Sequence, residues 1–344
     1  MKYFLSKFSI VLICSISLLS CDKSSDETPT GKTVYIAANE HTMLNRQGEI
    51  WRNGTLSDRD IYLNVNLTSM YVSGRDVYVV GKDFNQDYFG ESKYWKNGKA
   101  FLLENVRSKE VSGIFVSNQD VYVCGWELVS TVTGATAGIV SYWKNGHEVV
   151  LTDGTKEASA SSVFVSGNDV YVAGQEGNIA KYWKNGTPFS LPDTASYSYA
   201  LSIFVAGTDV FVAGCVNIVG HAFAVYWKNG IPFHLTDGNF VACANSIYVS
   251  NGDVYVAGYE GYKFQNVVAK YWKNGEPVVL GTESEQFPHE SFANSIFVSG
   301  SEVYVAGYQN TQQSTFATYW NNDTATYLTD EKMMWGEACS IMVQ

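Results

Sequence analysis

The pentapeptide YWKNG occurs at 94–98, 142–146, 182–186, 226–230 and 271–275, and looser copies read IWRNG at 50–54 and YWNND at 319–323. Asn followed by Gly is the pair that type I′ hairpin turns prefer, because both central residues need positive φ. Each copy therefore predicts a tight turn between two antiparallel strands. The two aromatic residues before the turn point to opposite faces of their strand, and we expect the tryptophans to fill the space between neighbouring sheets.

The tryptophans of these copies recur every 40 to 48 residues, so that seven units fill the chain from residue 33 onward. A typical unit, 295–330, contains four stretches in which Val, Ile, Tyr and Phe alternate with polar residues, separated by turn signals. This alternation is typical of β-strands. Seven repeats of four antiparallel strands predict an all-β fold, a seven-bladed β-propeller.

The repeat is cut inside a unit at both ends of the chain. The stretch TVYIAA at 33–38 matches the second strand of a unit, DVYVAG at 253–258, and SIMV at 340–343 matches the first strand, SIFV at 295–298. We therefore predict that the C-terminal strand joins the N-terminal blade and closes the ring without free edges.

The first twenty residues have the layout of a secretory signal: a basic start with Lys2 and Lys7, then the apolar stretch FSIVLICSISLL. This stretch is too short to span a membrane. The sequence LLSC at 18–21 resembles the lipobox of bacterial lipoproteins, which implies cleavage before Cys21 and lipidation of Cys21. An ordinary signal peptide with a chance cysteine is the alternative. The predicted organisation is a lipoprotein signal peptide at 1–20, a lipidated cysteine and flexible tether at 21–32, and the propeller at 33–344.

The formal net charge is −11, and loss of the two lysines of the signal brings it to −13. Such a surface repels phosphate backbones, so we predict no nucleic-acid partner. The cysteines after Cys21 show no CxxC spacing, and we predict neither a metal site nor a cofactor. Cys215 and Cys243 fall on the same side of adjacent units, but spacing alone leaves a disulfide between them open.

In each unit the first-to-second and third-to-fourth connections are tight turns, whereas the remaining connections emerge on the opposite face. We expect long loops there, and long loops on a rigid scaffold commonly carry function. The most variable stretches are 82–92, 126–141, 192–200, 259–267, 281–292 and 329–338.

Aromatic side chains beside carboxylates in these stretches suit a sugar or another flat amphipathic ligand, although loop packing could also employ them. The candidate ligand-binding residues are Tyr88, Trp126, Tyr199, Tyr259, Tyr262, Tyr308, Trp335, Asp83, Glu127 and Glu260. A ring of small residues at the first strands is expected to line the channel mouth or to serve backbone geometry. Its members are Ser69, Ser162, Ser202, Ser246, Ser295 and Ser340, with Gly113 in the remaining unit.

Catalytic motifs are missing from the sequence. There is no GxSxG, HExxH or P-loop, and all five arginines lie between residues 46 and 107. A carboxylate pair such as Asp83 with Glu127 has the right chemistry for glycoside hydrolysis, but no motif supports it. We predict no catalytic residues.

The stretches GHAFAVYWKNGIPFHLTDG at 220–238 and AKYWKNGEPVVL at 269–280 resemble the HAF-like, YWKNG-type extracellular repeats of uncharacterised bacterial lipoproteins. The resemblance implies an extracytoplasmic propeller and transfers no catalytic residues. We thus predict a monomeric, non-catalytic lipoprotein of the cell envelope, anchored in the outer membrane by its lipid and exposed at the surface. Its partner is a glycan, another small ligand or an envelope protein, with carbohydrate favoured. The alternatives are a polysaccharide-acting hydrolase or lyase, and a scaffold subunit of an outer-membrane nutrient-uptake complex.

Overall fold

The computed structural model divides the chain into residues 1–32 and residues 33–344. The second unit is built from strands and turns, and no helix long and apolar enough to cross a bilayer occurs in the described part of the chain. The predicted signal peptide and Cys21 lie outside the described residues. The described residues are 31–41, 46–57, 62–85, 90–106, 109–130, 134, 136–192, 197–262, 265–281, 290–311, 314–329 and 335–344.

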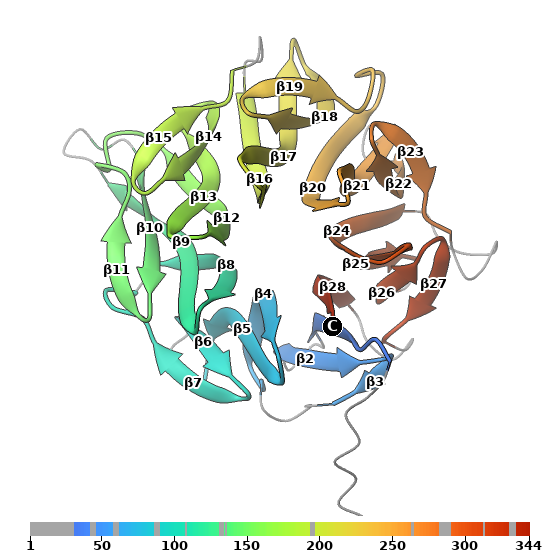
Figure 1. Cartoon of the computed structure of the whole chain (residues 1–344), viewed down its shortest axis with the longest axis horizontal. Coiled ribbons are helices and arrows are strands. Elements are labelled where there is room, and N and C mark those ends of the chain that lie inside the picture. The colour runs from blue at the N-terminus through green and yellow to red at the C-terminus, as the bar shows by residue number, and fades with distance from the viewer. Residues whose placement is uncertain are drawn as a thin grey trace, which may run out of the picture. The chain divides into compact units, whose positions relative to one another are not determined.

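The strands of residues 33–344 form antiparallel sheets around a central axis, as in a β-propeller (Figure 1). The innermost strands are β4 (Val65–Ser73), β8 (Glu110–Ser117), β12 (Ala158–Ser166), β16 (Tyr197–Ala206), β20 (Val241–Ser250), β24 (Glu290–Ser299) and β28 (Trp335–Val343). Next to them lie β1 (Val34–His41), β5 (Asp76–Asp83), β9 (Asp120–Ser130), β13 (Asp169–Glu176), β17 (Asp209–Ile218), β21 (Asp253–Tyr262) and β25 (Glu302–Asn310).

The third strands contain most of each YWKNG copy, and the short fourth strands follow the turn. The third strands are β2 (Arg46–Arg52), β6 (Glu91–Lys96), β10 (Thr136–Lys144), β14 (Ile179–Lys184), β18 (His221–Lys228), β22 (Gln265–Lys273) and β26 (Thr315–Asn321). The fourth are β3 (Thr55–Leu56), β7 (Lys99–Leu102), β11 (His147–Val150), β15 (Thr187–Ser190), β19 (Ile231–His234), β23 (Glu276–Val279) and β27 (Thr324–Tyr327).

Five of the sheets have four strands, and the sixth has eight. In the eight-stranded sheet, β24 to β27 form one antiparallel group, and β28, β1, β2 and β3 form another. A single parallel pair, Thr315 with Trp335, joins the two groups. β28 pairs with β1 so that Val343 faces Val34 and Ser340 faces Ala37. The predicted pairing of the two chain ends is confirmed.

The aromatic letters of YWKNG pack to opposite sides, as predicted. The repeated tryptophans are buried between neighbouring sheets, with Trp143, Trp227 and Trp320 fully enclosed, whereas Trp51 in the N-terminal copy is only half-buried. Three of the tyrosines stack on phenylalanines of the fourth strands, for example Tyr182 on Phe189 at 5.0 Å between ring centroids. The tryptophan thus packs the third strand against the neighbouring sheet, and the tyrosine packs it against the fourth strand of its own sheet.

The polar letters form a second repeated contact, seen clearly between β5 and β6. Lys96 lies 2.6 Å from Asp76 and 5.2 Å above the Tyr78 ring. The Asn97 side chain accepts a hydrogen bond from the backbone N–H of Val77 and donates one to Asp76. Four further copies repeat the lysine–aspartate pair, at Asp120, Asp169, Asp209 and Asp253. Asn97 also has a φ of 48°, so this residue both forms the turn and makes the hydrogen bonds to the second strand.

Each innermost strand contains a β-bulge, which shifts its register against the second strand. An extra residue breaks the period-2 alternation and bends the strand. Second and third strands also continue into the stretches predicted as loops: β9 ends at Ser130, β10 begins at Thr136, and β21 reaches Tyr262. The prediction of long loops at 126–141 and 259–267 was wrong, because paired strands occupy most of both stretches. The bulge residues are Thr68, Ser112, Ser161, Leu201, Asn245, Asn294 and Cys339.

Candidate functional site

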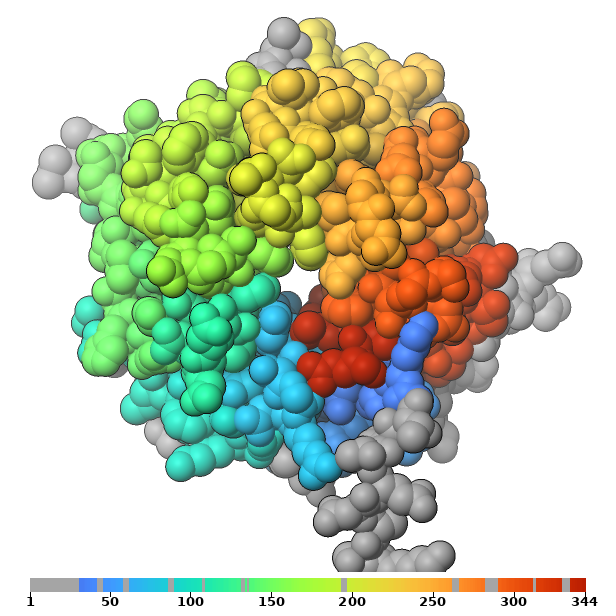
Figure 2. All heavy atoms as spheres, viewed as in Figure 1, coloured from blue at the N-terminus to red at the C-terminus, as the bar shows by residue number. Residues whose placement is uncertain are grey.

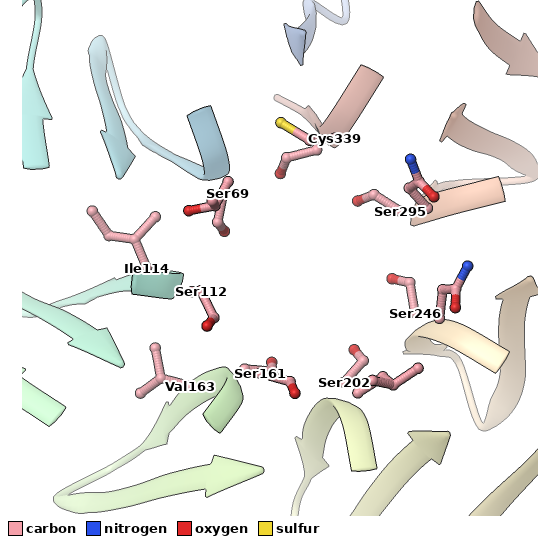
Figure 3. Close-up of a pocket in the computed structure, with 16 residues that line it drawn as sticks. Ser69, Ser112, Ile114, Ser161, Val163, Ser202, Ser246, Ser295 and Cys339 are labelled. Atoms are coloured by element: carbon pink, nitrogen blue, oxygen red, sulfur yellow. The ribbon is translucent and has the colours of Figure 1, made fainter. Parts of the chain in front are cut away.

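A polar cavity of about 170 Å³ lies on the axis of the ring. Side chains from all innermost strands converge on it (Figure 3), and Figure 2 shows an opening at the centre of the ring. Its lining includes the bulge residues and the predicted ring of small residues, which we call the serine ring: Ser69, Gly113, Ser162, Ser202, Ser246, Ser295 and Ser340.

The serine ring links neighbouring innermost strands. The hydroxyl of Ser202 accepts a hydrogen bond from the backbone N–H of Ile247 at 3.2 Å, and Ser246 and Ser295 make the same contact to the next strand. Gly113 is the exception because its unit carries Cys124 where the others carry Ala or Val. A Cβ added at Gly113 would lie 3.2 Å from the Cys124 sulfur. Backbone geometry thus accounts for the serines.

An aromatic belt follows two residues further along the innermost strands. Neighbouring rings contact one another at centroid distances between 4.7 and 5.0 Å, and Met342 holds the corresponding position in β28. The serine ring and the belt are nearly uniform around the axis, so neither distinguishes one unit from another as a binding site for a ligand. The belt consists of Tyr71, Phe115, Phe164, Phe204, Tyr248 and Phe297.

The chemistry becomes different in every unit on the other side of the bulge. There, one residue of the innermost strand faces one residue of the second strand, and we call these positions the mouth pairs. Variable side chains on a regular scaffold are where recognition is expected. The mouth pairs are Asn66–Lys82, Glu110–Trp126, Ser159–Gln175, Tyr199–Cys215, Cys243–Tyr259, Phe292–Tyr308 and Glu337–Asn39.

Three mouth residues form a continuous aromatic arc. The Phe292 ring stacks on Tyr308 with centroids 4.8 Å apart, and Tyr259 meets Phe292 edge-on at 4.9 Å. All three side chains are partly exposed. Beside the arc, Asn294 donates a hydrogen bond of 2.8 Å to Oε1 of Glu337. Asn294 also lines the central cavity, so its hydrogen bond places the Glu337 carboxyl next to the channel, and Phe292 of the arc lies two residues before Asn294.

Burial controls the titration of these groups. It raises the pKa of Glu337 to about 6, against the opposing effect of the Asn294 hydrogen bond. Burial also raises the pKa of Tyr308, and the charges of Glu337, Tyr259 and Glu290 act in the same direction. Burial raises the pKa of Tyr259 as well. At neutral pH the arc therefore presents phenol O–H donors beside a carboxylate, and its tyrosines are poor bases.

The structure brings together two of the predicted aromatic candidates, Tyr259 and Tyr308. Trp126 and Tyr199 belong to other mouth pairs, and Tyr199 is 42% exposed. Trp335 packs on the His41 ring at 4.6 Å. Tyr88 and the side chain of Tyr262 lie outside the described residues.

The three predicted carboxylates each pair with a lysine. Asp83 lies 3.0 Å from Lys93, Glu127 lies 3.4 Å from Lys109, and Glu260 lies 2.5 Å from Lys270. These ion pairs anchor the carboxylates within the sheets, so a ligand would have to compete with the lysines for them. Among the described residues, no group of three or more His, Cys, Asp and Glu side chains is placed to hold a metal ion.

Phe292, Asn294 and Glu337 were not among the predicted site residues. All three lie at or before a bulge, where the broken alternation concealed the strand. Comparison of the units could have found Phe292 and Glu337. When the first strands are aligned on their Ala–x–Ser stretch, the position before it varies between successive units and is Tyr199, Cys243, Phe292 and Glu337.

A disulfide joins Cys215 and Cys243, whose Cα atoms are 4.9 Å apart. It links neighbouring mouth pairs, Tyr199–Cys215 and Cys243–Tyr259. We expect replacement of both cysteines by serine to lower the free energy of unfolding by about 2–4 kcal/mol, because a cross-link of this span restricts the unfolded chain. Urea unfolding with and without reductant measures this. Reductant should leave the double variant unchanged, and equal stability of oxidised wild type and variant would contradict the expectation.

No protein-family model matches the sequence, and no curated protein sequence matches it. Among solved structures, an ulvan lyase of a polysaccharide lyase family superimposes with a TM-score of 0.54 and 10% identity, covering 85% of each chain. The β-propeller domain of the Trilobed protease from Pyrococcus furiosus gives a TM-score of 0.54 and 11% identity, covering 88% of this chain and 95% of the domain. A puromycin-hydrolysing peptidase from Mycobacterium tuberculosis gives 0.55 and 9%, with 86% of this chain covered and 53% of the peptidase. These similarities establish the propeller fold.

Proposed function

We propose that this chain is a seven-bladed, non-catalytic propeller that binds a carbohydrate or glycoconjugate at the channel mouth. The count of seven treats the two antiparallel groups of the eight-stranded sheet as separate blades. The observation that carries the function is the aromatic arc of Tyr259, Phe292 and Tyr308 beside the Glu337–Asn294 pair. Flat apolar faces next to directed hydrogen-bonding groups suit a sugar ring.

The proposed location of the protein follows from its first residues. The basic and apolar start and the LLSC stretch at 18–21 support export and lipidation at Cys21. In this proposal the polar residues 22–32 tether a surface-exposed propeller to the outer membrane, with the lipid as its membrane contact. A protein partner in the envelope is an alternative ligand for the same mouth.

Replacing Tyr308 by Ala is expected to weaken glycan binding about tenfold or more, because central aromatic residues dominate the binding energy of such sites. A glycan array probed with the full chain identifies the ligand, and calorimetry measures the dissociation constant. The matched control is Phe189→Ala, which removes an aromatic ring from the outer strand β15, where it stacks on Tyr182. Equal weakening by both substitutions would contradict a site at the mouth.

The second candidate function is a polysaccharide-acting enzyme at the same mouth. The fold shared with an ulvan lyase and the proximity of Tyr308 to Glu337 favour it. Its weakness is chemical: the raised pKa of Tyr308 makes the phenol a poor general base at neutral pH. Incubation of the full chain with polysaccharides distinguishes the two functions. An enzyme releases new chain ends, and Glu337→Gln should abolish this release, whereas a binding protein releases no chain ends.

A further inference from the structure

We infer that the mouth selects a ligand group carrying a positive charge, and that among sugars it favours a free amine over an acetylated amine or a carboxylate. This inference deepens the proposed function and rests on it. It is drawn from the aromatic arc and from the carboxyl groups that adjoin it.

The carboxyl of Glu337 is available to a ligand through one oxygen. Within the described part of the chain, Asn294 is the hydrogen-bond donor to Glu337, and it occupies Oε1. The side chain is partly exposed, which leaves Oε2 for a donor from a ligand. An ammonium group supplies such a donor together with a compensating charge, and hydrogen bonds between charged groups are the stronger ones.

The charges that act on the arc have the same sign. Glu337 and Glu290 both act on Tyr308. The amide of Asn310 donates a hydrogen bond of 3.3 Å to Oε2 of Glu290. Lys270, which faces Gly258 in the neighbouring ladder, is already paired with Glu260. A carboxylate or sulfate entering this region meets two carboxyl groups, and repulsion between like charges is strong where water is partly excluded.

The rings of the arc add a second attraction for a cation. A positive group above an aromatic face is attracted by the ring quadrupole, and the effect grows when water is displaced. The chain already uses this contact, since Lys96 and Lys184 lie 5.2 and 5.3 Å above tyrosine rings. Aromatic rings whose nearest charges are carboxylates are therefore matched to an amine-bearing sugar.

The test compares three oligosaccharides of equal length by calorimetry on the full chain at neutral pH: a glucosamine oligomer, its N-acetylated form and an oligogalacturonate. We expect the free-amine oligomer to bind at least about tenfold more tightly than the acetylated one, and the uronate to bind most weakly. Glu337→Gln should reduce the preference to near parity while acetylated binding is retained. The matched control, Glu276→Gln on the exposed outer strand β23, should keep the preference.

Equal affinity for the amine and acetylated forms, or a preference that survives Glu337→Gln, would overturn the inference and leave the proposed function intact. Absence of binding to every glycan would overturn the proposed function. In that case, if wild type binds spermidine and Glu337→Gln does not, the inference that the mouth selects amines stands, and the inference that its ligand is a sugar is wrong.

Discussion

Removal of residues 340–344 is expected to abolish the cooperative folding of the propeller. The segment contributes the buried side chains of Ile341 and Val343, and its loss leaves residues Val34–Ala37 of β1 without their partners in β28. It also holds both neighbours of β28. The N–H of Ile341 donates to Ser295 on β24, and the amide of Gln344 donates to the Val72 carbonyl on β4. An ordinary domain is stable by only about 5–15 kcal/mol, so the loss of these contacts and the exposure of unpaired strand edges remove a large part of that stability.

A point substitution in the same segment distinguishes the loss of buried contacts in β28 from the effect of shortening the chain. Ile341→Ala should lower the free energy of unfolding by about 2–5 kcal/mol, because it leaves a cavity among buried residues. Ile231→Ala, on the outer strand β19 where the side chain is 63% exposed, should change it by less than about 0.5 kcal/mol. Urea unfolding followed by circular dichroism measures both. A truncated chain that melts at the wild-type temperature would contradict closure by β28.

The fold was predictable from the sequence to the extent that its determinants are local or repeated. The turns follow from neighbouring residues such as Asn97 and Gly98, whose φ values of 48° and 78° fit the predicted hairpin. Closure was predictable because a repeat cut at both ends specifies which strand each end lacks. The pairing of Lys96 with Asp76 also had a signal, since the second strand begins with an aspartate in most of the units.

The mouth could not be predicted in the same way, because its contacts depend on the register of bulged strands and on the packing of one unit against the next. The stacking of Phe292 on Tyr308 needs the register of β24 against β25, and the bulge at Asn294 shifts that register by one residue. The Asn294–Glu337 bond joins β24 to β28, which are the innermost strands of two neighbouring units. No spacing in a single unit encodes either contact.

One contact between strands did leave a trace that could have been read. In a single unit, Gly113 replaces the serine of the ring and Cys124 replaces the usual Ala or Val of the second strand. Two departures from the repeat in one unit indicate that the positions touch, and the structure places them in contact. Comparing the units with one another is therefore as informative as finding the repeat.

Replacing Trp272 by Ala is expected to lower the free energy of unfolding by about 3–5 kcal/mol, because truncation of a buried tryptophan leaves a large cavity. Trp272 is 1% exposed and packs with Phe211, Ala213, Ile247 and Val256 between neighbouring sheets.

The matched control is Trp51→Ala, at the same position of the N-terminal copy. Trp51 is only half-buried, so its truncation leaves a smaller cavity and a smaller loss is expected. Chemical unfolding of both variants decides the question. If the two substitutions cost the same, burial between the sheets is not the reason for the repeated tryptophan. A larger loss at Trp272 ties the YWKNG repeat to the packing that holds the mouth pairs of adjacent sheets in place.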